Sequence, residues 1–284
     1  MKYTDTSVSE AFATEVDQKE NAISLGRAGL LFAQSHYPDL DCDWYLKQFD
    51  IVADAIQSRI SQAQSGETRL GVTIEYLFGE LGYQGNAEDY YDPRNSFINE
   101  VIDRRIGIPI SLSVVFLEIA SRVGIKANGV AFPGHFLVRV SESEVSEPVI
   151  VDPFDNGTSL GLEMFVARFR KRLDKPMSKE IITKMLSPAS KRDILIRQLR
   201  NLLAIYSNKR SLEDCLLVVN HILYLNPDLL NEIIHRGKLY DEMGYKEAAV
   251  LDYEKALSLS EDKALTASLE TALHAAKLEN KPIH

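Results

Sequence analysis

The chain has 284 residues, 45% of them hydrophobic and 26% charged, a balance typical of a globular protein with one large or two ordinary domains. Its formal net charge of −9 opposes binding to phosphate backbones, so we expect no nucleic acid partner. No long apolar run occurs and the N-terminus lacks the apolar core of a signal peptide, so we expect no membrane segment.

The first part of the chain is predicted to be helical, because apolar residues recur at helical spacing between residues 7 and 64. One helix ends before Pro38, since the residue that precedes a proline avoids the helical region. A second helix is predicted from about Asp43 to Ala63, and a third over about Glu67–Leu81 stops at Gly82. The apolar side of the second helix is expected to hold Trp44, Phe49, Val52, Ala53 and Ile56.

A polar, turn-rich loop over residues 85–93 and a helix over 95–105 come next. Gly107-Ile108-Pro109 then leads into an apolar helix, Ile110–Val123, because proline suits the first turn of a helix. Three short strands are predicted after Gly124, with bounds Ala127–Phe132, Phe136–Val140 and Val149–Val151. The polar segment Ser141–Glu147 is interpreted as a hairpin tip.

The chain is expected to be helical again from about Ser159, and the charged stretch Asp174–Lys191 is interpreted as the connection between two domains. A basic cluster just before this stretch is interpreted either as a solvated helix face or as a local basic patch. Its members are Arg168, Arg170, Lys171, Arg172 and Lys175.

The C-terminal third, from about Leu199 to Glu261, is predicted to form two tetratricopeptide-like helical hairpins, with a capping helix near Lys263–Leu278. These repeats have a period of 34 residues, which is the separation of Tyr206 and Tyr240. The same period places Cys215 opposite Ala249, where two helices touch, so this thiol is expected to pack rather than react. The predicted packing positions are Tyr206, Cys215, Gly237, Tyr240, Ala249, Tyr253 and Ala256.

Helical repeats of this kind present a concave surface that binds other proteins, so a protein partner is expected. Two repeats are few for an independent solenoid, and the alternative is that the N-terminal domain itself occupies their groove. Neither Cys42 nor Cys215 belongs to a CxxC pair or to a Cys/His group with zinc spacing. We therefore expect no metal and no cofactor, and a reducing, cytoplasmic location.

His135 opens one predicted strand and Asp152 closes the next, so a hairpin would bring the two side chains together. In a nucleophile triad an aspartate orients an imidazole, the imidazole takes the proton of the nucleophile, and a helix N-terminus stabilises the resulting anion. The apolar helix predicted after Gly107-Ile108-Pro109 precedes His135 and Asp152 in the chain and could supply such an N-terminus.

This order of helix, histidine and aspartate resembles the transglutaminase-like, papain-related superfamily, in which a cysteine begins the helix. A narrower resemblance is to the bacterial SirB family. It rests on the segments Tyr90-Tyr91-Asp92-Pro93, Asn95-Ser96-Phe97, Asn99, Gly107-Ile108-Pro109-Ile110-Ser111-Leu112, Pro133-Gly134-His135-Phe136 and Asp152-Pro153-Phe154. The resemblance implies an α+β, helix-rich transglutaminase-like domain with a small antiparallel sheet, about residues 1–175, and an all-α tetratricopeptide repeat domain, about 190–284. By name it also implies a link to the regulation of invasion genes.

The place of the transglutaminase nucleophile, 15 positions before Gly124, is held by Pro109. A thiol mechanism would require Cys42 to fold back into the site, because Cys215 belongs to the repeats. Ser111 is the other candidate nucleophile, although a serine near a helix start more often bonds its own backbone.

Without a thiol, the His135–Asp152 dyad has three interpretations: a relic that locks a hairpin, a pocket that recognises a carbonyl or amide, or a general acid–base pair. The cleft is expected to include Tyr90, Tyr91, Asn95, Asn99, Pro109 and Phe136, although polar residues of this loop also serve as turn formers. We therefore predict a non-catalytic protein-interaction or regulatory protein with a pseudo-active site. The alternative is a hydrolase or acyl transferase that uses Ser111 or Cys42 with the dyad; the oligomeric state is left open.

Overall fold

The structure, a computed structural model, describes residues 8–62, 68–141, 147–170 and 178–279. The chain divides into two compact units, one of which is Thr14–Gln198. The other combines the residues up to Ala13 with those from Leu199 onwards, so the boundary falls within helix α9 (Lys191–Lys209). The predicted division lay earlier, between residues 175 and 190. The predicted fold class is confirmed: a helix-rich unit holds a small antiparallel sheet, and an all-helical region follows.

The first unit is organised around helix α6 (Pro109–Arg122), in which every residue from Pro109 to Ala120 is buried. Such a helix is apolar all round because other elements cover it on every side. The remaining helices of this unit are α2 (Leu25–Ala33), α3 (Cys42–Gln62), α4 (Arg69–Ile74), α5 (Ile98–Arg104), α7 (Leu162–Arg170) and α8 (Lys179–Met185). Short helical turns cover Glu20–Ala22, Glu75–Glu80 and Pro93–Asn95.

A buried carboxylate ties α2 to α6. Glu118 accepts hydrogen bonds from the Gly26 amide at 2.8 Å and from the Ser24 hydroxyl at 3.0 Å, and its other oxygen pairs with Arg122 at 2.6 Å. Ser24 caps α2 by accepting from the Arg27 amide. The negative charge thus lies at the N-terminus of α2, where the helix dipole stabilises it.

The apolar side predicted for α3 is partly wrong. Phe49, Ala53 and Ile56 are buried, but Trp44 is 50% exposed. At about 100° per residue, Trp44 lies about 140° around the helix from Phe49, outside the buried stripe.

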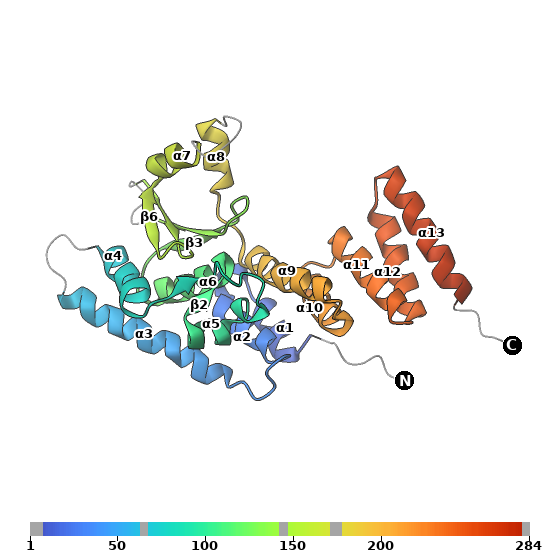
Figure 1. Ribbon diagram of the computed structural model, residues 1–284, viewed down its shortest axis with the longest axis horizontal. Helices are drawn as coiled ribbons and strands as arrows, with labels where there is room; N and C mark the ends of the chain where they lie inside the picture. The colour runs from blue at the N-terminus through green and yellow to red at the C-terminus, as the bar shows by residue number, and fades with distance from the viewer. Residues whose placement is uncertain (1–7, 63–67, 142–146, 171–177, 280–284) are drawn as a thin grey trace. The chain divides into compact units, whose positions relative to one another are not determined.

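The four-stranded sheet has the order β3-β4-β5-β6, and all neighbours are antiparallel. Its strands are β3 (Ala127–Val130), β4 (Leu137–Val140), β5 (Val149–Asp152) and β6 (Thr158–Gly161). Helix α6 covers one face of this sheet, and α7 and α8 cover the other (Figure 1). The prediction of helix from Ser159 is wrong, because β6 occupies that position and α7 begins at Leu162. The predicted hairpin tip falls mainly on residues 142–146, which lie outside the described residues.

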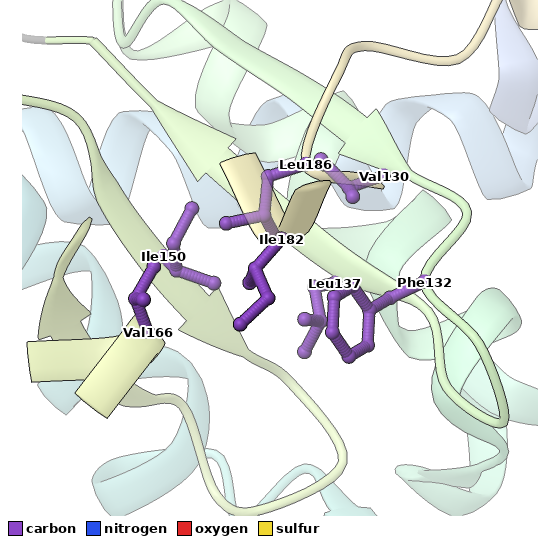
Figure 2. Packing of buried hydrophobic residues seen from close by; sticks show 7 residues of the cluster. All are labelled: Val130, Phe132, Leu137, Ile150, Val166, Ile182 and Leu186. Carbon is purple, nitrogen blue, oxygen red and sulfur yellow. The ribbon is translucent and has the colours of Figure 1, made fainter. Parts of the chain in front are cut away.

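Helix α8 lies in the stretch that the sequence predicted to be a connection. Ile182 and Leu186 are fully buried in an apolar cluster with the sheet and α7 (Figure 2). The remaining members of this cluster are Val130, Phe132, Leu137, Ile150 and Val166. Residues 171–177, with Lys171, Arg172 and Lys175 of the basic cluster, lie outside the described residues. The stretch from 179 to 186 is therefore part of the first unit and covers its sheet.

A two-stranded parallel pair completes the first unit. It joins β1 (Gln84–Gly85) to β2 (Ile106–Gly107). These two-residue strands were not predicted, because a run this short carries no periodicity.

The second unit contains α10 (Leu212–Leu225), α11 (Leu230–Glu242), α12 (Lys246–Leu259) and α13 (Lys263–Glu279), together with the end of α9. Short turns join these helices (Figure 1). Most of the residues predicted to form the repeat packing surface are buried, namely Tyr206, Cys215, Gly237, Ala249, Tyr253 and Ala256, whereas Tyr240 is half-buried. A Cβ on Gly237 would lie 2.9 Å from the Tyr253 ring, so α11 and α12 touch where glycine stands.

The N-terminal helix α1 (Glu10–Val16) contributes Phe12 to the second unit, where its ring meets the buried His221 edge to face at 5.0 Å. Within the described part of the chain, no helix has the length and apolar character needed to cross a bilayer.

Candidate functional site

The turn before β4 positions His135. The His135 amide donates to the Phe132 carbonyl at 3.0 Å, and Gly134 has a φ of +71°, a left-handed conformation that glycine adopts without strain. Arg197 donates to the His135 carbonyl at 3.2 Å. The backbone around the histidine is thus held from two sides.

The end of β5 positions Asp152. Val138 of β4 pairs with Val151 of β5, so the two strands bring His135 and Asp152 together as predicted from their spacing. The His135 Nε2 atom lies 3.0 Å from Asp152 Oδ2.

Asp152 is fixed by more than the histidine. Its Oδ1 atom accepts hydrogen bonds from the amides of Phe154 at 3.1 Å and Asp155 at 3.2 Å, and its carbonyl accepts from Gly157 at 2.9 Å. This is the pattern by which an aspartate builds a turn out of its own following residues. Both carboxylate oxygens of Asp152 are therefore engaged.

Both ring nitrogens of His135 are engaged as well. Nδ1 accepts a hydrogen bond from the Phe136 amide at 2.9 Å, which requires this nitrogen to be unprotonated. Nε2 must then carry the proton and donate it to Asp152. In a catalytic triad, the second ring nitrogen accepts the proton of the nucleophile. In this chain that nitrogen is Nδ1, and it accepts a hydrogen bond from the backbone instead.

A pocket of about 180 Å³ opens beside the dyad, on the sheet face that α7 covers. Its walls are largely apolar, with Phe132, Phe165 and Phe169 forming an aromatic side. Its ionisable lining residues are His135, Asp152, Asp155 and Arg168. Thr158 supplies a hydroxyl among the described lining residues.

The residues predicted to line the cleft do not line this pocket, apart from the dyad itself. Asn95, Asn99, Pro109 and Phe136 are buried within the fold, whereas Tyr90 and Tyr91 are 37% and 67% exposed. Asn95 donates to the carbonyls of Asp89 and Tyr90 and accepts from Asn86, so it shapes the loop rather than meeting a ligand.

The tyrosine loop nevertheless reaches the dyad through a series of ring contacts. The His135 ring lies 6.1 Å from the Phe154 ring, the Phe154 ring lies 6.3 Å from Tyr90, and the Tyr90 ring lies 5.3 Å from Tyr91. Gly85 permits this arrangement, because a Cβ there would lie 2.5 Å from the Phe154 ring.

Asp92 anchors the same loop. It accepts from the Arg94 amide at 3.0 Å and pairs with the Arg94 guanidinium at 2.7 Å, while its side chain is nearly buried. Burial alone would raise the pKa of the Asp92 carboxyl, but the hydrogen bonds from Arg94, together with the positive charges of Arg94 and Arg104, outweigh it and hold the pKa below its usual value.

Ser111 has a structural role. Its side chain is fully buried, its hydroxyl donates to the Asn95 carbonyl at 2.6 Å, and it accepts from the Ile108 amide at 3.1 Å. The hydroxyl thus caps α6 and holds the turn at Asn95, and its proton is already used. This geometry does not prepare Ser111 for attack on a substrate.

Neither cysteine is activated. Burial raises the pKa of the Cys42 thiol at the start of α3, and burial also raises the pKa of Cys215 in α10. A raised pKa keeps a thiol protonated and unreactive at neutral pH. Among the described residues, no group of three or more His, Cys, Asp or Glu side chains is arranged to hold a metal ion.

The family model of the transglutaminase-like superfamily matches residues 43–200. A UPF0162 protein of Xylella fastidiosa (strain Temecula1) is 36% identical over 82% of this chain and 83% of its own length. Protein SirB1 of Salmonella typhimurium is 25% identical over 75% of this chain and 78% of its own. F-box only protein 21 of Homo sapiens is 27% identical over 59% of this chain and 27% of its own. No solved structure matches the chain. The resemblance predicted from the sequence motifs is confirmed.

The dyad geometry predicts the tautomer of His135. At a pH where the imidazole is neutral, long-range proton–nitrogen correlation spectra should show a protonated Nε2 and a bare, hydrogen-bonded Nδ1. Asp152→Asn should alter the His135 signals while those of exposed His274 stay unchanged. A protonated Nδ1 in the native protein would contradict this geometry.

Loss of the Asp92 carboxylate should loosen the tyrosine loop. Asp92→Ala should lower the free energy of unfolding at pH 7 by about 1 kcal/mol, the usual cost of losing a helix N-cap, and Glu88→Ala in the same loop is the control. Because the folded-state pKa of Asp92 is lowered, its stabilisation is present above the ordinary aspartate pKa and is lost as the pH falls through the folded-state value. Denaturant unfolding of the three proteins between pH 7 and pH 3 measures this, and a difference between Asp92→Ala and wild type that does not decrease towards the acid end would refute it.

Proposed function

The chain belongs to the transglutaminase-like superfamily, and from this premise we propose that it is a non-catalytic recognition protein. One observation carries the proposal: both ring nitrogens of His135 are occupied, one by Asp152 and the other by the backbone. A histidine in this state orders its turn but has no free lone pair with which to take a proton from a nucleophile.

The nucleophile positions agree with this proposal. The helix start that holds a cysteine in transglutaminases holds Pro109, and the Ser111 hydroxyl is spent on backbone contacts. The competing hypothesis of a hydrolase or acyl transferase needs Ser111 or Cys42 to reach the dyad, and both are buried.

The C-terminal helices supply the second part of the proposal. We infer that α9 to α12 form two tetratricopeptide-like hairpins, capped by α13, that bind a protein partner. Small residues at the helix contacts support this, since Gly237 and Ala249 are buried where neighbouring helices meet. The pocket beside His135 would be the other recognition surface, and the protein would act by holding its partners together.

The thiols provide a direct test of the non-catalytic proposal. Iodoacetamide at pH 7 should label Cys42 and Cys215 slowly in the folded protein and completely after unfolding, as measured by peptide mass spectrometry. His135→Ala should not change either rate. Rapid labelling of Cys42 that falls in the His135→Ala variant would mean that the histidine activates this thiol, and the proposal would then fail.

Capture of partners from cell extract tests the proposal that the chain recognises another protein. Full-length wild type and the His135→Ala variant would be used as baits in cell extract, and each recovered partner would be incubated with the purified proteins. We expect a specific partner whose intact mass stays unchanged after incubation with wild type. A mass change produced by wild type and absent with His135→Ala would show that the site is catalytic.

A further inference from the structure

The size of the pocket beside the dyad limits what it can hold. Its volume of about 180 Å³ is slightly larger than the engineered cavity of about 150 Å³ that binds benzene. One large apolar group, such as the side chain of leucine or phenylalanine, would fill it. A peptide of several residues would not fit inside.

The wall that such a group would contact is aromatic. The Phe132 ring meets Phe165 edge to face at 5.5 Å and Phe169 at 4.5 Å, while Phe165 and Phe169 stack one helical turn apart on α7. Leu137, Ile150 and Leu160 of the sheet also line the pocket. This lining favours a group that gains free energy by leaving water and carries no polar atoms at its far end.

Two opposite charges stand at this pocket without partners among the described residues. Arg168 of α7 lines the pocket and is exposed, and its guanidinium forms no hydrogen bond and no ion pair with any described side chain. Asp155, in the turn after β5, lines the pocket and is exposed as well, and its carboxylate is equally unpaired in the described structure. The two residues do not pair with each other, although both border the same cavity.

A ligand with one charge would meet only one of these groups. A cation would leave Arg168 unpaired, and an anion would approach Asp155 and the neighbouring Asp152. A zwitterion satisfies both, because its ammonium group can face the carboxylates while its carboxylate faces the guanidinium.

We propose that the pocket binds a free amino acid with a large apolar side chain, an inference that rests on the proposed recognition function. The side chain would lie against Phe132, Phe165 and Phe169. The α-ammonium group would donate to Asp155 and Asp152, and the α-carboxylate would accept from Arg168. His135, with both nitrogens engaged, forms part of the wall and does no chemistry.

The test is isothermal titration of the full-length protein with L-phenylalanine and L-leucine, and with glycine as the ligand that lacks the apolar group. We expect binding of one molecule per chain for the two apolar amino acids and none for glycine. Arg168→Gln and Asp155→Asn should each weaken binding roughly tenfold or more, because each removes a hydrogen bond to a charged group. Lys47→Gln and Asp39→Asn, at exposed positions outside the pocket, are the matched controls and should leave binding unchanged.

Two derivatives of phenylalanine identify which charged groups of the ligand the pocket binds. L-Phenylalanine amide lacks the carboxylate, so it should bind about tenfold more weakly than the acid to wild type and equally weakly to Arg168→Gln. N-acetyl-L-phenylalanine lacks the ammonium group and should show the same relation to Asp155→Asn. If the amide binds as tightly as the acid, the pocket reads the N-terminal residue of a peptide and the free amino acid assignment is overturned.

Leu160→Trp separates this inference from the proposed function, because a larger side chain at Leu160 would fill the pocket. Circular dichroism would establish that this variant is folded. If wild type binds no amino acid at millimolar concentration, yet captures a partner that Leu160→Trp loses, recognition at the pocket stands and the amino acid inference is wrong. If His135→Ala instead acquires or loses turnover of a captured partner, the recognition function itself is wrong.

Discussion

The geometry of the site depends on the hydrogen bonds that the Asp152 carboxylate accepts. This carboxylate joins the end of β5, the turn that follows and the histidine of the neighbouring hairpin, with one oxygen on two backbone amides and the other on the imidazole. Hydrogen bonds to an ionised acceptor are stronger and shorter than neutral ones. The turn that presents Asp155 and the imidazole that lines the pocket are therefore linked through this one side chain.

At the start of α6, Pro109 and Ser111 stand where transglutaminases have a cysteine and its neighbours. Pro109 occupies the first turn, where a missing amide proton costs nothing, and Ser111 bonds both the helix start and the Asn95 carbonyl. The positive end of the helix, which stabilises a thiolate in an enzyme, is here satisfied by its own chain. The polar groups at the start of α6 are therefore engaged within the fold.

The proximity of His135 and Asp152 and most of the helices could be predicted from the sequence, because the two residues lie at strand ends and the apolar spacing of α3 and α6 is regular. The pocket could not be predicted. Phe165, Arg168 and Phe169 belong to a helix whose start is displaced by β6, a four-residue strand that contains glycine and has no clear alternation. The stretch that forms helix α8 was predicted to be a connection, because only the tertiary structure shows that Ile182 and Leu186 pack in a buried apolar cluster. Phe136 and Asn99 were expected to be accessible, yet Phe136 is buried just before β4 and Asn99 is buried in α5, because the tertiary packing around a motif cannot be read from the motif itself.

The order of the strands in the sheet is also their order in the chain, and each joins its neighbour as an antiparallel hairpin. Sheets built in this way need only local loop closure, whereas the hydrogen bonds from Ser24 and Gly26 to Glu118 close loops of 94 and 92 residues. The contacts that form the dyad are thus low in contact order, and the docking of α2 onto α6 carries the larger entropic barrier. In kinetic terms, the sheet with its dyad should form before α2 docks onto α6, and this docking should set the rate of folding of the unit.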